Sequence, residues 1–444
     1  MSVALTTDLY ELTMAASYLS RGMTQSATFS LFVRDLPRDR GFLVAAGLDS
    51  VLTVLEEFAF DAADLSWLAG QGFDAAAVDA FAALRFTGDV WAIPEGRVVL
   101  PNEPLLEVTA PLPEAQLVES ILLNQITFQT VLATKATRCS LAARGRASLV
   151  DFSLRRTHGI EASMAAARAA AIAGFAGTSN VEAARRLGVP AVGTMAHSYV
   201  EAFPTEREAF IAMATDFPDR TAFLVDTYDT ITGVEIAIDV AEALGRSDRL
   251  AVRIDSGDLL ELSRRTREKL DAAGRQDATI IVSGGLDEFD VERLLDEGAP
   301  INAFGVGTRI GVSADAPSLE TVYKLVEYAG EPTMKLSEGK QSMPGAKQVF
   351  RSAVGIDDVL AERSETAPAG TSPVLIEVMR GGERTRPPER IAMAADRLDA
   401  DLAQLPETAR LLRDPTVPSV RVSDQLQRLT QQVADAHRKL NDAR

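Results

Sequence analysis

The middle of the chain alternates between short apolar runs and longer amphipathic stretches. The amphipathic stretches, such as Ile160–Ala173 and Leu259–Ala273, carry apolar residues at helical spacing. Regular alternation of strand and helix is typical of a parallel sheet whose strands are connected by helices. The predicted strands are Leu149–Ser153, Ala173–Thr178, Ala191–Thr194, Ala222–Val225, Leu250–Ile254, Thr279–Val282 and Ile301–Val306.

Polar or glycine-bearing tails follow nearly every one of these runs. In a (β/α) barrel the carboxyl ends of all strands converge on one pocket, whereas an open sheet brings only a few of them together. We therefore predict an α/β fold with a (β/α) barrel, irregular if it closes with seven strands. The tails are Arg155-Arg156-Thr157-His158, Thr178-Ser179-Asn180, His197-Ser198, Asp226-Thr227-Tyr228-Asp229, Asp255-Ser256-Gly257-Asp258, Ser283-Gly284-Gly285 and Gly305-Val306-Gly307-Thr308.

The regions on either side have a different pattern. On the N-terminal side, Thr28–Val33 alternates like a strand. On the C-terminal side, Lys335–Arg351 is rich in Gly, Lys and Ser. After it, we expect Val359–Ala361 to pair with Val374–Val378 as a β-hairpin. We predict four parts: a smaller N-terminal α+β domain at 1–115, a connecting helix at 116–140, the (β/α) barrel catalytic domain at 141–330, and a C-terminal hairpin and helical extension at 331–444 that partly packs back on the N-terminal domain.

Composition narrows the class of partner. The 444 residues carry a net charge of −18, with a pI near 4.8. Such a surface repels nucleic acid and anionic membranes, so we expect neither as a partner, while small anions can still bind where cations gather. No apolar run approaches the length of a membrane span. The single cysteine, Cys139, excludes an intramolecular disulfide, and a cytoplasmic protein is expected.

One of the three histidines stands at a predicted strand end, in Gly193-Thr194-Met195-Ala196-His197-Ser198. A histidine at this place can act as a general base or carry a phosphoryl group. It can equally be a residue that packs and hydrogen-bonds locally, and His197 taken alone favours that second interpretation.

Two neighbouring strand ends predict a phosphate site. In Ser283-Gly284-Gly285 and Gly305-Val306-Gly307-Thr308, backbone N–H groups can approach phosphate oxygens closely; the alternative is two ordinary glycine turns. Arg155, Arg156 and Arg253 add positive charge at the same edge. Arg253 lies in an apolar run, so either an anionic ligand or pairing with Asp255 or Asp226 must compensate its charge. The pocket is therefore predicted to bind a phosphorylated sugar and a second anion.

Taken together, these motifs resemble those of nicotinate phosphoribosyltransferase, in the type II phosphoribosyltransferase group. They keep the family's order from the N-terminus to about residue 351. The matching segments are TDLYELTM (7–14), DFSLRRTHG (151–159), GTSNVEAARRLGVPAVGTMAHS (177–198), VDTYDT (225–230), RIDSGDL (253–259), VSGGLDE (282–288), FGVGT (304–308), DAPSLETVYKLVE (315–327) and PGAKQVFR (344–351).

The resemblance implies a reaction and its co-substrates. Nicotinate and 5-phosphoribosyl-1-pyrophosphate would give nicotinate mononucleotide and pyrophosphate, with coupled hydrolysis of ATP and with Mg²⁺ on the substrate phosphates. It also implies a homodimer with shared active sites.

The roles of individual residues follow from the same resemblance. His197 would be phosphorylated by ATP, with Asp255 as the second catalytic residue, and Thr194 and Arg253 would hold nicotinate. Tyr10 would stack on the nicotinate ring from the neighbouring subunit. The phosphate groups would be bound by Arg155, Arg156, Ser283, Gly284, Gly285, Gly305, Gly307 and Thr308.

Three alternatives stay open. A relative that uses nicotinamide would share the fold and would replace the carboxylate with an amide. A barrel lyase or isomerase acting on a sugar phosphate would release no pyrophosphate. A non-catalytic dimer could bind a nucleotide as a sensor. His158 departs from the small residues expected after the paired arginines, and it either caps the following helix or assists phosphate binding.

Overall fold

The computed structural model describes residues 3–245, 250–337 and 341–442 and divides into two compact units. The first unit is Met1–Val131 together with Ser318–Arg444, and the second is Leu132–Pro317. Helix α6 (Glu119–Ala143) contributes residues to both units. The C-terminal segment thus belongs to the same unit as the N-terminal one, and the unit boundaries differ from those predicted at 115, 140 and 330.

The first unit is built on a seven-stranded antiparallel sheet in the order β13-β12-β1-β5-β3-β17-β18. Its central strands β1 (Ser26–Val33) and β5 (Pro104–Pro111) are almost entirely buried. The sheet combines both ends of the chain, including β12, which the sequence pattern places in the 141–330 domain. The other strands are β3 (Asp89–Ala92), β12 (Thr321–Tyr328), β13 (Glu331–Pro332), β17 (Ile376–Arg380) and β18 (Glu383–Arg384).

A four-stranded sheet in the same unit corrects one prediction. Strand β15 (Asp358–Glu362) pairs with β14 (Lys347–Ser352) and β19 (Val420–Val422), whereas β17 pairs with β3. The predicted hairpin between Val359–Ala361 and Val374–Val378 is therefore wrong. The sequence analysis did not predict strand β14, because its charged residues are typical of a loop. In the structure, carboxylates of other strands neutralise these charges. The remaining elements of this part are β16 (Thr371–Pro373) and the pair β2 (Leu43–Val44) and β4 (Val98–Val99).

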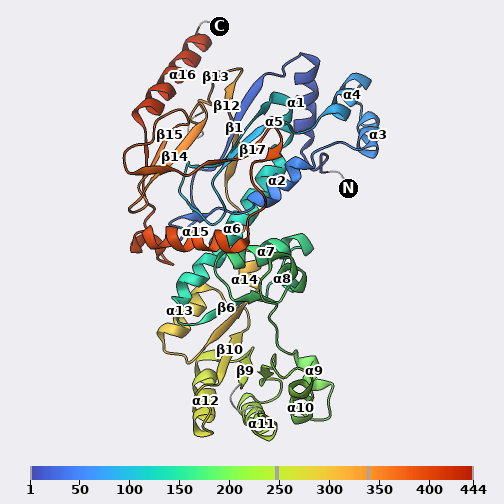
Figure 1. Ribbon diagram of the computed structural model, residues 1–444, viewed down its shortest axis with the longest axis vertical. Helices are drawn as coiled ribbons and strands as arrows, with labels where there is room; N and C mark the ends of the chain where they lie inside the picture. Colours follow the sequence, from blue (N-terminus) through green and yellow to red (C-terminus); the bar gives the residue numbers. More distant parts are fainter. Residues whose placement is uncertain (1–2, 246–249, 338–340, 443–444) are drawn as a thin grey trace. The chain divides into compact units, whose positions relative to one another are not determined.

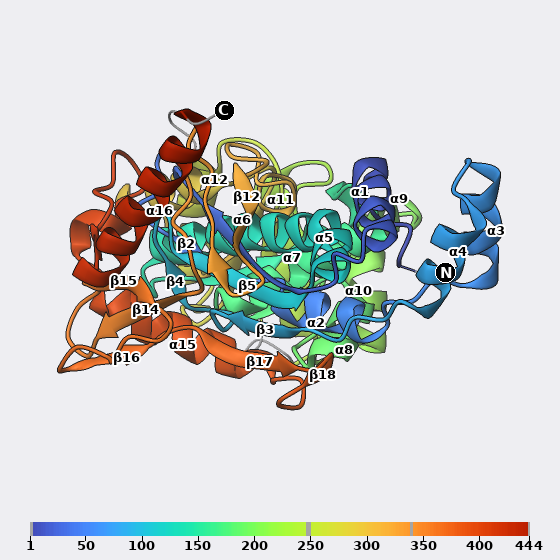
Figure 2. The ribbon, with the colours of Figure 1, turned by 90° about the horizontal axis from the view of Figure 1, so that it is seen from above.

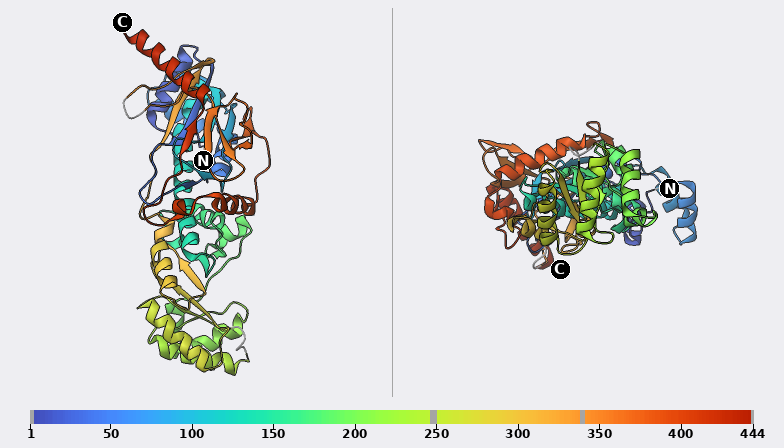
Figure 3. Two further views of the ribbon diagram at one scale, coloured as in Figure 1. Left: turned by 90° about the vertical axis from the view of Figure 1, so that its left-hand side faces the viewer. Right: turned by 90° about the horizontal axis from the view of Figure 1, so that it is seen from below.

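Helices surround these sheets. Helices α3 and α4 stand apart from the sheets of their own unit (Figures 1 and 2). Helix α16 begins on β15 and extends beyond the four-stranded sheet (Figures 1 and 3). The helices of this unit are α1 (Leu9–Ser20), α2 (Leu48–Glu56), α3 (Ala62–Gly70), α4 (Ala75–Ala83), α5 (Leu112–Leu117), α15 (Ile391–Gln404) and α16 (Asp424–Asp442).

The second unit confirms an α/β fold with a parallel sheet. Its six strands run in the order β7-β6-β11-β10-β9-β8, and every neighbouring pair is parallel. The strands are β6 (Ser148–Asp151), β7 (Gly177–Thr178), β8 (Phe223–Leu224), β9 (Ala251–Ile254), β10 (Thr279–Ser283) and β11 (Ala303–Val306).

Closure into a barrel is not confirmed. The seventh predicted strand, Ala191–Thr194, forms only an isolated bridge between Ala191 and Thr178. Among the described residues, the sheet ends at β7 on one side and β8 on the other. Pro190 has no N–H to donate and Gly193 lacks a side chain to pack, so this segment is poorly suited to a longer ladder.

Helices connect the parallel strands, and α11 and α12 pack side by side (Figure 1). The helices are α7 (Ile160–Ile172), α8 (Val181–Leu187), α9 (His197–Glu201), α10 (Glu206–Asp216), α11 (Thr230–Ala243), α12 (Leu259–Ala272), α13 (Glu288–Asp296) and α14 (Thr308–Gly311). In the part of the chain that the structure describes, no helix has both the length and the apolar character needed to cross a membrane.

Candidate active site

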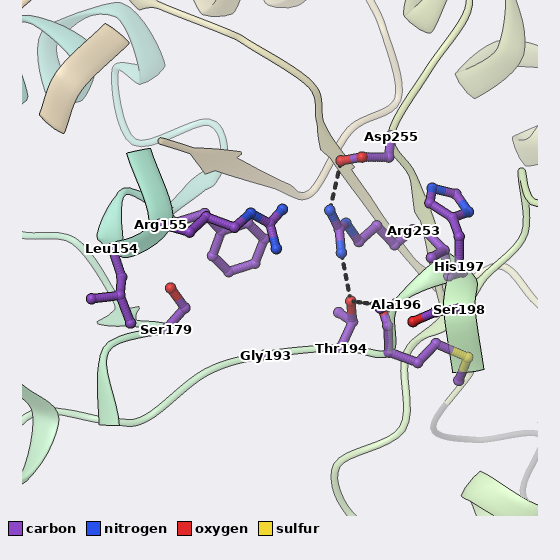
Figure 4. Close-up of a pocket in the computed structure, with 13 residues that line it drawn as sticks. Leu154, Arg155, Ser179, Gly193, Thr194, Ala196, His197, Ser198, Arg253 and Asp255 are labelled. Carbon is purple, nitrogen blue, oxygen red and sulfur yellow. Dashed lines mark hydrogen bonds and ion pairs between the residues drawn. The ribbon is translucent and has the colours of Figure 1, made fainter. Parts of the chain in front are cut away.

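A cavity of about 520 Å³ opens among the carboxyl ends of the strands of the second unit (Figure 4). Four of the predicted catalytic and nicotinate-binding residues line it: Thr194, His197, Arg253 and Asp255. Parallel strands bring their carboxyl ends to one edge, which explains how residues far apart in the sequence meet here. The remaining lining residues are Phe152, Leu154, Arg155, Ser179, Gly193, Met195, Ala196, Ser198 and Leu224.

Arg253 occupies the centre of a hydrogen-bond network. It extends from β9, is 8% exposed, and donates from Nε to Ser283 Oγ at 2.8 Å. Its Nη1 donates to Thr194 Oγ1 at 2.8 Å and its Nη2 to Asp255 Oδ1 at 2.6 Å, as Figure 4 shows. The guanidinium also lies 5.3 Å from the centroid of the Phe152 ring. A guanidinium has more N–H donors than these three bonds use, so Arg253 can still bind a ligand.

Asp255 compensates the charge of the buried Arg253. The sequence left open whether an anionic ligand or a nearby aspartate does so, and in the structure it is this aspartate. Burial alone would raise the pKa of Asp255, but the hydrogen bond from Ser283 and the charge of Arg253 hold it below its usual value. Asp255 therefore stays ionised beside the guanidinium. The charges of Arg253 and Asp255 cancel. Arg253 therefore binds a ligand mainly through its directed N–H donors and less through its net charge.

His197 lies at the first turn of α9 and is half-buried. Its Nδ1 is 3.1 Å from Thr227 Oγ1, in the tail of β8. No described residue bonds to its Nε2. When Thr227 accepts the Nδ1 proton, Nε2 carries the lone pair, which is the arrangement needed for a nucleophile or a general base.

Only one of the two adjacent arginines, Arg155 and Arg156, lines the cavity. Arg155 and Arg156 end the short 3₁₀ helix Leu154–Arg156 that follows β6, and both are exposed. Arg155 lines the cavity, and Arg156 is not among its lining residues. Neither arginine forms an ion pair with any residue that the structure describes, so their charges are open to an anion.

The predicted phosphate turns lie at the ends of β10 and β11 but do not line this cavity. Ser283 is buried and donates to Asp255 as well as accepting from Arg253. A Cβ at Gly284 would lie 2.4 Å from the Asp255 carbonyl oxygen, and a Cβ at Gly305 would lie 2.5 Å from the Phe152 ring. These positions therefore require glycine for packing alone.

The other members of the two turns differ among themselves. A Cβ at Gly307 would lie 2.6 Å from the Phe152 carbonyl oxygen, which again requires glycine. Gly285 adopts a φ of +73° with open space around it, and Thr308 is exposed at the start of α14. Gly285 and Thr308 are thus the two members that are free to meet a ligand.

Tyr10 belongs to the first unit. It lies in the first turn of α1 and is 46% exposed, next to Leu9, which is 61% exposed.

Sequence reasoning did not identify two residues that contact the side chains of the site, Phe152 and Thr227, or the buried carboxylate Glu206, which does not line the cavity. Phe152 follows β6 and lies under the Arg253 guanidinium, and it stood inside the predicted strand Leu149–Ser153 as an ordinary apolar residue. Thr227 bonds to His197 and stood in a polar tail without a distinguishing pattern. Glu206 begins α10 as a buried carboxylate. Burial, with the charges of Asp226 and Asp229, raises the pKa of Glu206 to about 7. No sequence signal marked Glu206, because acidic residues are common at helix starts.

Two family models and several known proteins match this chain. Residues 5–127 match the nicotinate phosphoribosyltransferase (NAPRTase) N-terminal domain, and residues 147–360 match the NAPRTase family. The chain is 47% identical over 446 residues to nicotinate phosphoribosyltransferase pncB2 of Mycobacterium tuberculosis, covering 98% of this chain and 96% of that protein. It is 32% identical over 514 residues to nicotinate phosphoribosyltransferase of Homo sapiens, covering 96% and 95%.

Solved structures give the same result. The crystal structure of human nicotinic acid phosphoribosyltransferase has a TM-score of 0.86 at 30% identity, covering 96% of this chain and 99% of that one. The fold, with its N-terminal domain and parallel sheet, is therefore that of the human protein. With matches to both its N-terminal and its main domain, the chain belongs to the nicotinate phosphoribosyltransferase family.

Proposed function

We propose that the protein converts nicotinate and 5-phosphoribosyl-1-pyrophosphate into nicotinate mononucleotide and pyrophosphate, with coupled hydrolysis of ATP through a phosphohistidine at His197. The observation that carries this proposal is that an anchored arginine and a histidine with an unbonded Nε2 line the same cavity. Membership of the family supports the transfer reaction, and the ATP coupling is the finer part of the proposal.

Nicotinate binding is assigned to Arg253 and Thr194. The remaining guanidinium N–H donors would bind the carboxylate of nicotinate, and the bonds to Ser283, Thr194 and Asp255 fix their direction. An amide in place of the carboxylate would present an NH₂ group to these donors, which is unfavourable. This contrast supports the acid over the amide as substrate.

Phosphoryl transfer is assigned to His197. Nε2 would attack the γ-phosphorus of ATP, forming an N–P bond as the bond to the ADP oxygen breaks, and hydrolysis would later release phosphate. Thr227 contacts the ring at Nδ1. With Thr227 Oγ1 accepting the Nδ1 proton, the lone pair would be on Nε2. The unpaired charges of Arg155 and Arg156 would bind phosphate oxygens, and Gly285 and Thr308 would bind the 5-phosphate of the sugar.

Mg²⁺ is proposed to enter with the substrate phosphates. Asp255 lines the cavity, and its Oδ2 bonds to no described residue, so it offers the carboxylate oxygen that Mg²⁺ accepts. When bound, the ion would neutralise charge on the leaving pyrophosphate. The residues of the chain supply orientation: Arg253 and Thr194 hold the pyridine ring so that its nitrogen can capture the sugar carbon.

A homodimer with shared active sites completes the proposal. Exposed apolar side chains flank the strand ends near the cavity: Leu154 is 41% exposed, Ile160 81% and Val181 70%. A second exposed apolar pair, Leu9 and Tyr10, lies on α1. We assign both surfaces to contact with a second copy, which would bring its Tyr10 to the nicotinate ring. Sedimentation of the purified chain tests the assembly, and a monomer at assay concentrations would contradict it.

The function itself is tested by a substrate comparison. The protein is assayed with 5-phosphoribosyl-1-pyrophosphate and Mg²⁺ against nicotinate, nicotinamide and quinolinate, each with and without ATP. Of the three pyridine substrates, we expect only nicotinate to give mononucleotide and pyrophosphate. ATP should increase the rate of this reaction and should be converted to ADP. Turnover only with nicotinamide would overturn the substrate, and an equal rate without ATP would overturn the coupling. Absence of pyrophosphate release with all three would favour the sugar-phosphate lyase or the nucleotide sensor.

A further inference from the structure

An ion pair joins the tails of β10 and β11, outside the residues that line the cavity. The two strands pair in parallel, and their register ends at Ser283 and Gly305. Beyond this point both segments leave the sheet through glycine turns. Asp287 Oδ2 then accepts a hydrogen bond from Arg309 Nη1, which links the two tails again. The tails are thus connected twice, once by the sheet and once by these two side chains.

The ion pair lies next to the two residues that are free to meet a ligand. Asp287 follows Gly285 by two positions, and Arg309 follows Thr308 directly. Two residues of extended chain span at most about 7 Å, so a displacement of either member of the pair is passed on to its turn. The ion pair is therefore placed to set the separation of the two turns.

The Asp287 side of the pair is firmly held. Asp287 is 6% exposed, and its Oδ1 accepts from the N–H groups of Phe289 and Asp290 at 3.0 and 3.2 Å. These bonds cap α13, so the helix fixes one oxygen of the carboxylate while the other oxygen receives Arg309. Burial acts to raise the pKa of Asp287, but hydrogen bonds from Arg309 and from the backbone of Asp290 hold it below its usual value. Asp287 is therefore an ionised anchor for Arg309.

A buried lysine holds the far end of the β11 tail. Lys135 Nζ lies 2.6 Å from Glu288 Oε2 and 2.6 Å from Asp315 Oδ1, and the lysine side chain is 1% exposed. Glu288 directly follows Asp287. Two consecutive acids at the start of α13 therefore hold the β11 tail, one directly and one through Lys135. Because the far end is fixed in this way, loss of the ion pair would release mainly the end that carries Thr308.

We propose that Asp287 and Arg309 are positioning residues for the sugar 5-phosphate: their ion pair holds Gly285 and Thr308 at the separation at which both reach oxygens of one phosphate group. Donors on two separate loops bind one anion tightly only when binding does not have to order them. The inference rests on the proposed function for the assignment of the 5-phosphate to these turns. Neither member of the pair lines the cavity, so nicotinate binding at Arg253 should not depend on it.

Three variants and one matched control test the proposal. Arg309→Met removes the guanidinium, Asp287→Asn removes the negative charge but keeps an oxygen that can cap α13, and the third variant combines both changes. Arg293→Met is the control, because the Arg293 side chain is 52% exposed against 51% for Arg309 and pairs with Glu297 at 3.4 Å. Calorimetry measures the binding of ribose 5-phosphate, and steady-state kinetics measures the KM of each substrate.

We expect the dissociation constant of ribose 5-phosphate to rise about tenfold in each single variant. The double variant should bind no more weakly than the weaker single variant, because both changes break the same ion pair. Arg293→Met should stay within about twofold of the wild type. The KM for 5-phosphoribosyl-1-pyrophosphate should rise by a factor similar to the dissociation constant, while the KM for nicotinate stays within about twofold.

The other outcomes contradict the proposal. Unchanged binding of ribose 5-phosphate in Arg309→Met, or no binding by the wild type, would overturn it. Weaker binding in Arg309→Met but not in Asp287→Asn, or additive losses in the double variant, would make Arg309 a direct phosphate ligand and overturn the positioning role. Equal increases in both KM values would show that the pair serves the fold alone. The binding measurement needs no turnover, so if it gives the expected pattern while no nicotinate mononucleotide forms, the proposed function fails and the positioning role stands.

Discussion

Individual residues of the site could be predicted where a polar or charged side chain interrupts, or directly follows, an apolar run of the sequence. Arg253 stood out because a cation in an apolar run must be paired, and the structure pairs it with Asp255. His197 stood out because it follows a predicted strand. Phe152 and Thr227 could not be found in this way, because each contributes through a partner distant in the sequence, Arg253 and His197. Hydrophobic patterns predict which residues are buried, not which of them meet.

The three bonds of Arg253 predict that lysine cannot replace it. In Arg253→Lys one ammonium must substitute for three donors directed at Ser283, Thr194 and Asp255, which leaves at least one of them unpaired. We expect the KM for nicotinate to rise about tenfold or more, with the KM for ATP within about twofold of the wild type. Steady-state kinetics with each substrate varied in turn measures this. Equal effects on both KM values would mean that Arg253 serves the fold alone.

The hydrogen bond at Nδ1 makes a prediction for His197. We expect His197→Ala to abolish acid-labile labelling of the protein by ATP that carries a label in the γ-phosphate. Thr227→Val removes the hydroxyl that orients the ring and should slow labelling about tenfold without abolishing it. His437→Ala, which changes a histidine of α16 in the first unit, is the control and should label normally. Labelling that persists in His197→Ala would place the acceptor elsewhere.

At the scale of elements, the sequence predicted the type of element better than its partner. Six of the seven apolar runs became strands of the parallel sheet, because buried β-rich segments between helices have few other structures available. Strand β14 was overlooked, since Lys347 and Arg351 give it the composition of a loop. Both side chains are buried, and Glu107 and Asp358 neutralise them across the fold. Such compensation comes from other strands and leaves no local signal.

Arg351 predicts a large loss of stability when it is replaced. Its Nε and Nη2 bind Asp358 at 3.0 and 2.6 Å, its Nη1 binds Asp401 at 2.8 Å, and its side chain is 2% exposed. Arg351→Met would leave Asp358 buried without this cation and Asp401 paired with Arg97 alone, so we expect a decrease of about 3–5 kcal/mol in the free energy of unfolding. Urea denaturation measures it.

An exposed arginine provides the comparison for Arg351. The side chain of Arg421 is 63% exposed and pairs with Asp357 at 3.1 Å. Its replacement by Met should cost less than about 1 kcal/mol, because water screens such pairs. Similar losses in the two variants would show that the Arg351 network contributes no more than a surface ion pair.

At the scale of the whole molecule, the sequence could not predict which strands lie next to each other in the sheet of the first unit. β12 and β17 pair with β1 and β3, so the first unit is assembled from segments separated by the entire second unit. Local periodicity contains no information about such distant pairing. The protein-wide excess of acidic residues, by contrast, was plain from the composition, and some of these acids are buried.

A buried acid with a raised pKa makes the stability of the protein depend on pH, and Glu11 is such an acid in the first unit. Burial, with smaller contributions from Glu119 and Asp8, raises the pKa of Glu11 from 4.5 to about 7, although hydrogen bonds from Ser120 and Thr7 act against the shift. In the unfolded chain the group ionises at its usual value. The folded protein therefore binds the proton more tightly, so its stability is full below 4.5 and is lost as the pH rises through about 7.

Glu11→Gln should remove this loss, because the amide keeps hydrogen-bond partners for Thr7 and Ser120 and cannot ionise. We expect the variant to be more stable than the wild type by about 1–2 kcal/mol above the pKa of Glu11, and of similar stability below 4.5. Urea denaturation across that interval measures the difference, and Glu57→Gln, which changes an exposed carboxylate of the same unit, is the control. Parallel curves for the wild type and Glu11→Gln would mean that Glu11 ionises at an ordinary pKa and is not the source of the alkaline loss.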